Sequence, residues 1–432
     1  MSKLLKELIL QNIAKHLEFR DAVKLLFLSK DFYDAKMKVF CRSIVSRPEN
    51  LENITRLFCS ETAEIKIKVD PMYDYQTNTK KVEELLDIVK KSGFKNLCLD
   101  IEGNEYYIHQ IFGQLALNLE SLKIVAKTNA INLSFDFKNI NVKRFSIHSS
   151  TVFLSLLSSD DVLKELEEIE IVPMKINFCT FRMKSLKANK LKFFHTEFFT
   201  QLFNRIPCII VNTKKLLFDS CLFNVTNSIE VVNSDIEEIV FQKIRSFGYF
   251  ETIKLAINSD ELKKLILDSE KKLNFIMHFK RMNLRIKELQ CKNCGLSITN
   301  SRNSEQYDEL VIDTLTIDWS IPDRDQNVPP DRYLMLWKCT VNNLNIQTIM
   351  KMNKLEFNET KIQNLEIYVH STKYELFLYP KNVSIENMTI FTDVCKVLAI
   401  EQRPYTQGIK NLKIVTKNDI CVKSEIPYVL EC

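Results

Sequence analysis

A short pattern of apolar positions recurs along most of the chain. Each copy reads apolar, two residues, apolar, one residue, apolar, as in residues 119–124, 236–241 and 362–367. With the middle apolar residue as the marker, the copies fall at positions 97, 122, 145, 169, 186, 216, 239, 265, 289, 310, 344, 365, 388 and 412. The average step is about 24 residues, which predicts an array of about 14 degenerate repeats over residues 94–432.

The segments between these copies have a different spacing. Residues 107–112, 196–203, 274–282 and 393–400 place apolar side chains as a short helix would. Each repeat is therefore expected to hold one short strand and one helical return. The predicted fold class is α/β, with a curved parallel sheet, helices on its convex side and a short helical N-terminal head.

The marker and the residue two positions later are expected to point into the core. Residues at −1, +1 and +3 from the marker then share the concave face of the sheet, because side chains alternate along a strand. From residue 168 to residue 313 this face carries more acids than bases. After residue 340 it changes mostly to uncharged amides, with Tyr368 and Phe391 among them.

From about residue 94 to residue 418 this pattern resembles the leucine-rich repeat family, whose repeats are 20–29 residues long. The family's ladder position lies three residues after the last apolar strand residue and is usually Asn or Cys. Here Cys221 and Cys294 match it, whereas Glu102 and Met174 do not. The resemblance implies a leucine-rich-repeat sheet with uneven curvature.

The first ninety residues lack the repeat. Residues 5–17 and 23–30 read as two helices, and Asp21 between them is placed to favour a helix N-terminus. Residues 1–45 are expected to form this head and residues 46–93 a helical linker. Within the linker, residues 79–91 predict a helix and residues 65–69 a first, truncated strand of the sheet.

The order of elements in the head resembles an F-box, the helical motif that docks on a Skp-family adaptor. Lys6 departs from the family, which usually has proline there. The resemblance implies an adaptor-binding surface of apolar side chains, formed by Leu5, Ile9, Leu10, Ile13, Leu17, Leu25, Leu28 and Phe32. An F-box ahead of leucine-rich repeats is the arrangement of F-box/leucine-rich-repeat proteins. An ordinary helical cap for the repeat array is the alternative interpretation of this segment.

Composition excludes several functional classes. The six glycines are never closer than ten residues, so the Walker A loop and the dinucleotide-binding turn are absent. The net charge is +5 without a basic cluster, which disfavours nucleic acid as a partner. No apolar stretch is long enough to span a membrane, and the N-terminus does not read as a signal peptide. A cytoplasmic or nuclear protein with reduced cysteines is expected.

No cofactor, metal site or catalytic set is predicted. Cys291 and Cys294 form the one C-x-x-C, but a zinc site needs two further ligands, so burial is preferred to metal or redox chemistry. His148 is expected on the sheet surface. Trp319 lies in an insertion, residues 318–332, which is either a ligand-contacting loop or a tolerated surface segment whose charges and prolines disfavour burial.

These patterns favour a non-catalytic substrate receptor of a cullin-type ubiquitin ligase. It would bind the adaptor through residues 5–40, and a cullin through that adaptor, and would hold a target protein on the repeats. The expected target contacts suit a segment with Lys or Arg rather than nucleic acid, and they are Glu168, Glu170, Glu238, Glu288, Glu309, Asp313 and Tyr368. A leucine-rich-repeat scaffold outside the ubiquitin system is the alternative.

Overall fold

The computed structural model describes residues 21, 24, 43–46, 64–69, 87, 90–91, 94–101, 117–126, 131–135, 140–149, 152–156, 167–172, 179–180, 185–198, 208–223, 227–233, 235–246, 251–270, 273–279, 284–298, 310–320, 333–349, 352–402, 408–424 and 426–431. The chain forms two compact units. Unit 1 takes residues 1–183, 187–189 and 194–196, and unit 2 takes residues 184–186, 190–193 and 197–432.

Unit 1 is built on strands that pair in parallel, in the order in which they follow along the chain. These strands are β1 (Ser43–Ser46), β2 (Glu64–Val69), β3 (Asn96–Ile101), β4 (Leu117–Ala126), β6 (Ile140–Ser149) and β8 (Glu168–Val172). A separate parallel pair joins β5 (Ile131–Phe135) to β7 (Val152–Leu156), and β9 (Cys179–Thr180) is a short strand. The predicted strand over residues 65–69 is confirmed as β2, but β1 precedes it.

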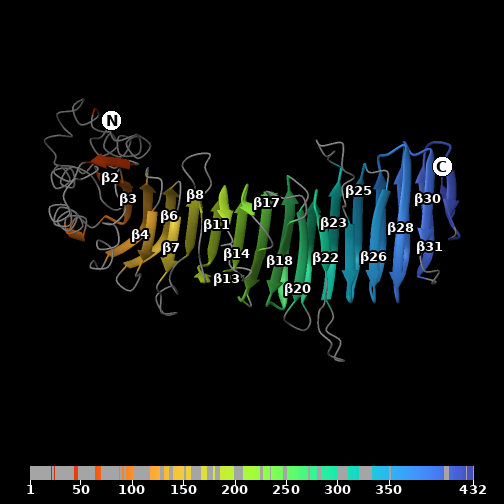
Figure 1. The fold of residues 1–432 in the computed structure, drawn as a ribbon, viewed down its shortest axis with the longest axis horizontal. Helices are drawn as coiled ribbons and strands as arrows, with labels where there is room; N and C mark the ends of the chain where they lie inside the picture. The colour runs from red at the N-terminus through yellow and green to blue at the C-terminus, as the bar shows by residue number, and fades with distance from the viewer. Residues whose placement is uncertain are drawn as a thin grey trace, which may run out of the picture. The chain divides into compact units, whose positions relative to one another are not determined.

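Unit 2 contains two parallel sheets whose strands alternate along the chain, as the green and blue part of Figure 1 shows. The main sheet holds β11 (Lys190–Phe194), β14 (Lys215–Asp219), β17 (Glu238–Ser246), β19 (Glu261–Ser269), β21 (Arg285–Lys292), β23 (Leu310–Trp319), β25 (Cys339–Thr348), β27 (Lys361–Val369), β29 (Ser384–Thr392), β31 (Ile409–Thr416) and β33 (Val429–Glu431). The second sheet holds β10 (Ser185–Lys187), β13 (Cys208–Asn212), β16 (Asn227–Val231), β18 (Glu251–Ile257), β20 (Leu273–Phe279), β22 (Gly295–Ile298), β24 (Tyr333–Trp337), β26 (Met352–Asn358), β28 (Lys373–Lys381), β30 (Val397–Gln402) and β32 (Cys421–Ser424). Two short strands, β12 (Thr196–Phe198) and β15 (Leu222–Phe223), pair beside the end of β17. Unit 2 is thus a β-solenoid, in which one coil is a main-sheet strand followed by a second-sheet strand.

The prediction of a repeat array is confirmed, and the sequence repeat corresponds to one coil. Leu265 of β19 lies beside Leu289 of β21, and both are fully buried. The two residues between Leu262 and Leu265 both lie outside the core, because the strand is kinked there and Lys263 drops out of the ladder. This kink explains the unequal spacing of the apolar positions. After the kink, the marker and the residue two positions later are buried, as predicted.

The predicted α/β leucine-rich-repeat fold is wrong. Every element bounded within the described residues is a strand, and the described residues in helical conformation are Asp21, Lys24, Asp87, Lys90 and Lys91. The expected helical return over 274–282 is largely strand β20, and the one over 393–400 includes the start of β30. In β20, Leu273, Phe275 and Met277 are buried and alternate with half-buried residues, which is the period of a strand. Residues 107–112 lie outside the described residues.

Two predicted markers are also wrong. Leu289 pairs with Leu315 rather than with Leu310, and Leu315 in turn pairs with Leu344. Leu186 belongs to β10 of the second sheet, while the buried Leu191 of β11 takes the place in the main sheet. With Leu191 and Leu315 as markers, the repeat is more regular than the sequence indicated.

Trp319 is buried, contrary to the expectation of a surface position. It is the last residue of β23, fully enclosed, and its indole N–H donates to the Cys294 carbonyl at 3.0 Å. Leu315, Ile317 and Trp319 share the inward face of one strand, whereas the neighbouring Asp318 points outward. Residues 321–332 of the predicted insertion lie outside the described residues.

Inward side chains at the end of the main-sheet strands join one coil to the coil before it. The thiols of Cys221 and Cys294 donate to the Phe193 and Leu267 carbonyls, each at 3.3 Å. The Ser269 hydroxyl donates to the Ile244 carbonyl at 3.1 Å. The expected burial of Cys291 and Cys294 is confirmed, and Cys221 is buried as well. These bonds satisfy carbonyls that face the solenoid interior.

Candidate interaction surface

The outer face of the main sheet in unit 2 is arranged in columns, because each residue lies beside its equivalent one coil later. The column one residue before the marker carries Lys215, Glu238, Lys264 and Glu288 in the middle coils, and we name it the charge column. The same column in the C-terminal coils carries Asn343, Asn364, Asn387 and Asn411, and we name it the amide column. The same structural position thus carries charged side chains in the middle coils and neutral amides in the C-terminal coils.

In the charge column opposite charges alternate. The Lys215 Nζ atom lies 3.4 Å from a carboxylate oxygen of Glu238, and Lys264 lies in register between Glu238 and Glu288. In-register pairing places equivalent residues of successive coils side by side. Like charges would repel one another there, so a column of charges is stable only when the sign alternates.

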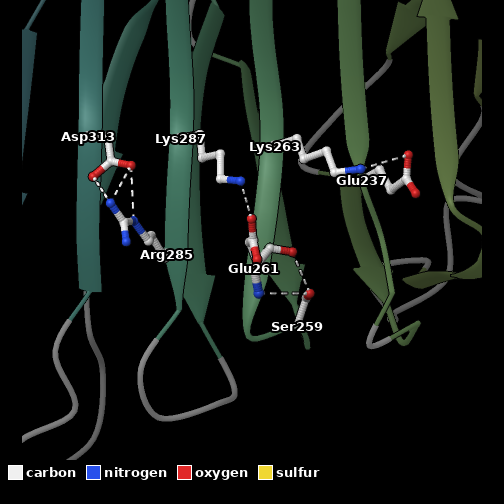
Figure 2. A network of polar contacts seen from close by, with 7 residues as sticks. All are labelled: Glu237, Ser259, Glu261, Lys263, Arg285, Lys287 and Asp313. Atoms are coloured by element: carbon white, nitrogen blue, oxygen red, sulfur yellow. Dashed lines mark hydrogen bonds and ion pairs between the residues drawn. The ribbon is translucent and has the colours of Figure 1, made fainter.

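Beside the charge column, ion pairs join successive coils, as Figure 2 shows. Lys263 reaches Glu237 at 3.5 Å, Lys287 reaches Glu261 at 2.6 Å, and Arg285 holds Asp313 through two hydrogen bonds of 2.9 and 3.0 Å. The hydrogen bond and the charge of Lys287 lower the pKa of Glu261, and Asp313 raises the pKa of Arg285. Each exposed pair of this kind adds little stability, but together the pairs neutralise charges of the face that a partner would otherwise meet.

The amide column pairs with itself. Asn364, Asn387 and Asn411 each donate one amide N–H to the side-chain oxygen of the preceding asparagine, and each distance is 3.1 Å. The first member, Asn343, donates to the Asp313 carbonyl at 3.3 Å. Each ladder amide keeps a second N–H for other partners.

An aromatic stack lies on the same face, three residues after the markers. The rings of Tyr368 and Phe391 are 4.7 Å apart and nearly parallel. The Tyr368 hydroxyl donates to Glu366 at 2.8 Å, and this bond is the main reason for the raised pKa of Tyr368. Both rings are half-buried, so part of the stack is exposed to solvent.

The predicted target residues do not form one cluster. Glu168 and Glu170 lie on β8 of unit 1, while Glu238, Glu288, Asp313 and Tyr368 lie on four different coils of unit 2, and Glu309 is outside the described residues. Most of the acids already have a neighbour that donates to them or carries a positive charge. Glu288 accepts a hydrogen bond from Gln290 at 2.5 Å, and Asp313 also accepts one from Asn342 at 3.1 Å. Asp313 lies in the kink rather than at the position that the marker Leu310 had predicted.

The eight predicted adaptor contacts cannot be placed. Leu5, Ile9, Leu10, Ile13, Leu17, Leu25, Leu28 and Phe32 all lie outside the described residues. Within residues 5–40 the structure describes Asp21 and Lys24, which are three positions apart and form an ion pair of 2.8 Å.

Ser146, His148 and Glu170 come together on unit 1. The Nε2 atom of His148 lies 3.0 Å from the Ser146 hydroxyl and 3.7 Å from the Glu170 carboxylate. In a nucleophilic triad the acid contacts the other ring nitrogen of the histidine, which leaves the first one for the serine. The geometry of this group therefore does not match that of a serine nucleophile and its base. His148 is half-buried on β6, as expected for a sheet surface.

Buried thiols offer no reactive group. Burial raises the pKa of Cys98 and of Cys339 to about 12, and it raises that of Cys294 well above its usual range. The sulfur atoms of Cys291 and Cys294 are 3.0 Å apart, and both side chains are enclosed. A thiol kept protonated in this way is a poor nucleophile. The described part of the chain contains no group of three or more His, Cys, Asp or Glu side chains able to hold a metal ion.

A second group of large outward side chains was not predicted from the sequence. The outward positions of β24 and β28 carry half-buried side chains, which are Tyr333, Met335, Trp337, Phe377 and Tyr379. The Lys354 ammonium of the strand between them lies 5.1 Å from the centre of the Tyr379 ring. The alternation of large residues in 333–337 could have revealed these positions if that segment had been interpreted as a strand.

The chain matches no protein-family model, no curated protein and no solved structure. No helix within the described ranges is long and apolar enough to cross a membrane.

Proposed function

We propose that the protein is a non-catalytic binding subunit that holds a target protein on the outer face of the main sheet in unit 2. The observation that carries this proposal is the amide column with its aromatic stack. Hydrogen-bonding amides beside large rings are the composition of protein-binding surfaces, in which aromatic residues supply much of the affinity.

The chemistry of the described residues supports a binding role rather than catalysis. The buried thiols are protonated, the Ser146–His148–Glu170 group lacks the geometry of a relay, and the solenoid interior is filled by side chains. A packed parallel solenoid presents long, regular outer faces, and repeat proteins commonly bind partners on such faces.

The finer proposal is that the target is held for a cullin-type ubiquitin ligase. Its support is the resemblance of residues 5–40 to an F-box, with a β-solenoid where leucine-rich repeats were expected. The chain would then contribute proximity between the target and the ubiquitin-carrying enzyme. It would act in the cytoplasm or the nucleus, where its cysteines stay reduced. A scaffold outside the ubiquitin system is the alternative function.

Co-purification of the full chain with a Skp-family adaptor tests the finer proposal. We expect Leu17→Asp with Leu28→Asp to abolish adaptor capture, because two charges would interrupt the apolar surface that the resemblance implies. The matched control is Gln11→Asp with Asn12→Asp, which adds the same charge outside the predicted apolar set. Failure of the unchanged chain to capture an adaptor favours the scaffold.

A further inference from the structure

One carboxylate on the C-terminal coils differs from Glu386 and Asp313 of the same face. Glu386 has Lys410 at 3.6 Å, as Asp313 has Arg285 in the preceding coils. Glu366 of β27 has no cation within 4 Å among the described residues, and its partner is the neutral Tyr368 hydroxyl. Its charge on this face is therefore not compensated by the fold.

The surroundings of Glu366 are uncharged as well. In register it lies between Asn345 of β25 and Thr389 of β29. Along its own strand the outward neighbours are Asn364, in the amide column, and Tyr368, in the aromatic stack. In the charge column, by contrast, a glutamate has a cation beside it, because Lys264 lies in register between two glutamates.

The aromatic stack makes this position suited to a planar cation. One face of the Tyr368 ring lies against Phe391, and the opposite face points toward the coil of Gln347, which precedes it in register. Gln347 is exposed. A cation that pairs with Glu366 from that side could also lie over the face of the Tyr368 ring that Phe391 does not cover.

We propose that Glu366, Tyr368 and the adjoining amide column bind an arginine side chain of an extended segment in the target protein. The proposal rests on the proposed target-binding function and names the chemistry of the target. A guanidinium group can bind a carboxylate through two N–H groups and stack on a ring at the same time, which a lysine ammonium cannot. The amide column then offers spare N–H groups to the backbone carbonyls of the segment.

This assignment moves the cation site away from the middle coils. There the acids expected to attract Lys or Arg already face Lys215, Arg285 or Gln290. A partner cation would have to displace Lys215 or Arg285, and beside Glu288 it would meet Lys264 in register, whereas at Glu366 it has only a tyrosine hydroxyl to share.

Selection of phage-displayed random twelve-residue peptides on the full-length chain tests the proposal. We expect the recovered peptides to be enriched in arginine at one position. Synthetic copies should bind Glu366→Gln about tenfold more weakly by isothermal titration calorimetry, because a partly desolvated charge pair is lost. Replacing the peptide arginine with citrulline, its uncharged analogue, should weaken binding to the unchanged chain by a similar factor.

Glu386→Gln is the matched control, since it removes a carboxylate that already has a lysine partner on the next coil. It should change peptide affinity by less than about twofold, as expected for an exposed pair. Tyr368→Leu, which keeps Glu366 and removes the ring, should weaken the arginine peptides more than their lysine analogues.

The outcomes separate the two proposals. Peptides that bind tightly without arginine enrichment, or that bind Glu366→Gln as well as the unchanged chain, would overturn the arginine site and leave the target-binding function standing. Recovery of no binding peptide would overturn both. Adaptor capture is measured separately and does not depend on either result.

Discussion

The middle and C-terminal coils of unit 2 share one backbone plan but place their aromatic side chains on opposite sides of the main sheet. In the middle coils Phe193, Phe218 and Phe241 stack inside, with ring centres 5.0 and 4.8 Å apart. In the C-terminal coils the same inward positions hold isoleucines, and Tyr368 and Phe391 stack outside. The aromatic stack of the middle coils is part of the core, whereas the C-terminal stack lies half-buried on the outer face.

The outer columns differ in the same way. Charges in the middle coils must alternate to be stable, and their pairing leaves little for a partner. Amides in the C-terminal coils can be identical, because each one both donates and accepts. The C-terminal face can therefore be regular and uncharged and still keep hydrogen-bonding groups at its surface.

The largest expected difference in stability comes from removing one phenyl ring from each stack by substitution. Phe218→Ala should lower the free energy of unfolding by about 3–5 kcal/mol, since it removes a fully buried ring from between two others. Phe391→Ala, the control, should cost about 1 kcal/mol or less, because its ring is half-buried. Chemical denaturation of both variants measures the difference. Equal losses would contradict the distinction between a buried, stabilising stack and a half-buried outer stack.

The next effect tests the alternation of charge. Lys264→Glu would place three glutamates in successive coils, so we expect a loss of about 1 kcal/mol at low salt from two like-charge neighbours. In about 1 M salt, where screening acts over roughly 3 Å, most of this loss should disappear. Lys264→Gln removes the charge without adding repulsion and is the control. A loss that is independent of salt would point to packing instead.

A smaller effect is expected in the amide column. Asn364→Ala removes one hydrogen bond to Asn343 and one from Asn387, and should cost about 0.5–1 kcal/mol. Because no charge is involved, this loss should be the same at low and high salt. Gln363→Ala, at the adjacent kink position, should leave the midpoint of denaturation unchanged within about 0.5 kcal/mol. A salt-dependent loss at Asn364 would mean that the two columns do not differ as proposed.

Both columns can be inferred from the sequence once the repeat is known. Lys215, Glu238, Lys264 and Glu288 occupy the same place in successive repeats, and so do the four asparagines of the amide column. The uncharged register neighbours of Glu366 can be found by the same comparison. The amide-rich face was predicted, but the cation was expected on the middle coils, because a count of charges along the chain does not show which of them pair across repeats.

The second sheet could not be recognised from its apolar pattern alone. In 273–279, a mostly apolar segment, the inward Phe275 and Met277 are separated by Ile276, which is also apolar and points outward. Such a run fits a helix as well as a strand, and the leucine-rich-repeat resemblance favoured the helix. Trp319 was misplaced for a related reason. The charges around it belong to outward Asp318 and to the residues that follow, while its own position continues the inward series of Leu315 and Ile317.

The smallest expected effect is a difference in acid sensitivity between the two regions. The pKa of Glu261 is lowered in the folded protein, first by its hydrogen bond with Lys287 and then by the charge of that lysine. A lowered folded-state pKa means that the carboxylate form stabilises the fold above the usual glutamate pKa. This contribution is lost as the pH falls through the folded-state value. The amide column has no titrating group and should not respond.

Carboxylate titration followed by nuclear magnetic resonance measures this effect directly. Lys287→Met should return the pKa of Glu261 toward its usual range, because the hydrogen bond and the nearby positive charge are both lost. Lys410→Met, which removes the exposed partner of Glu386 on the C-terminal coils, should leave the pKa of Glu261 unchanged. If Glu261 titrated normally in the unchanged chain, the ion pairs of Figure 2 would not be formed in solution. The charges of the middle coils would then be as available to a partner as Glu366, and the contrast between the two faces would be lost.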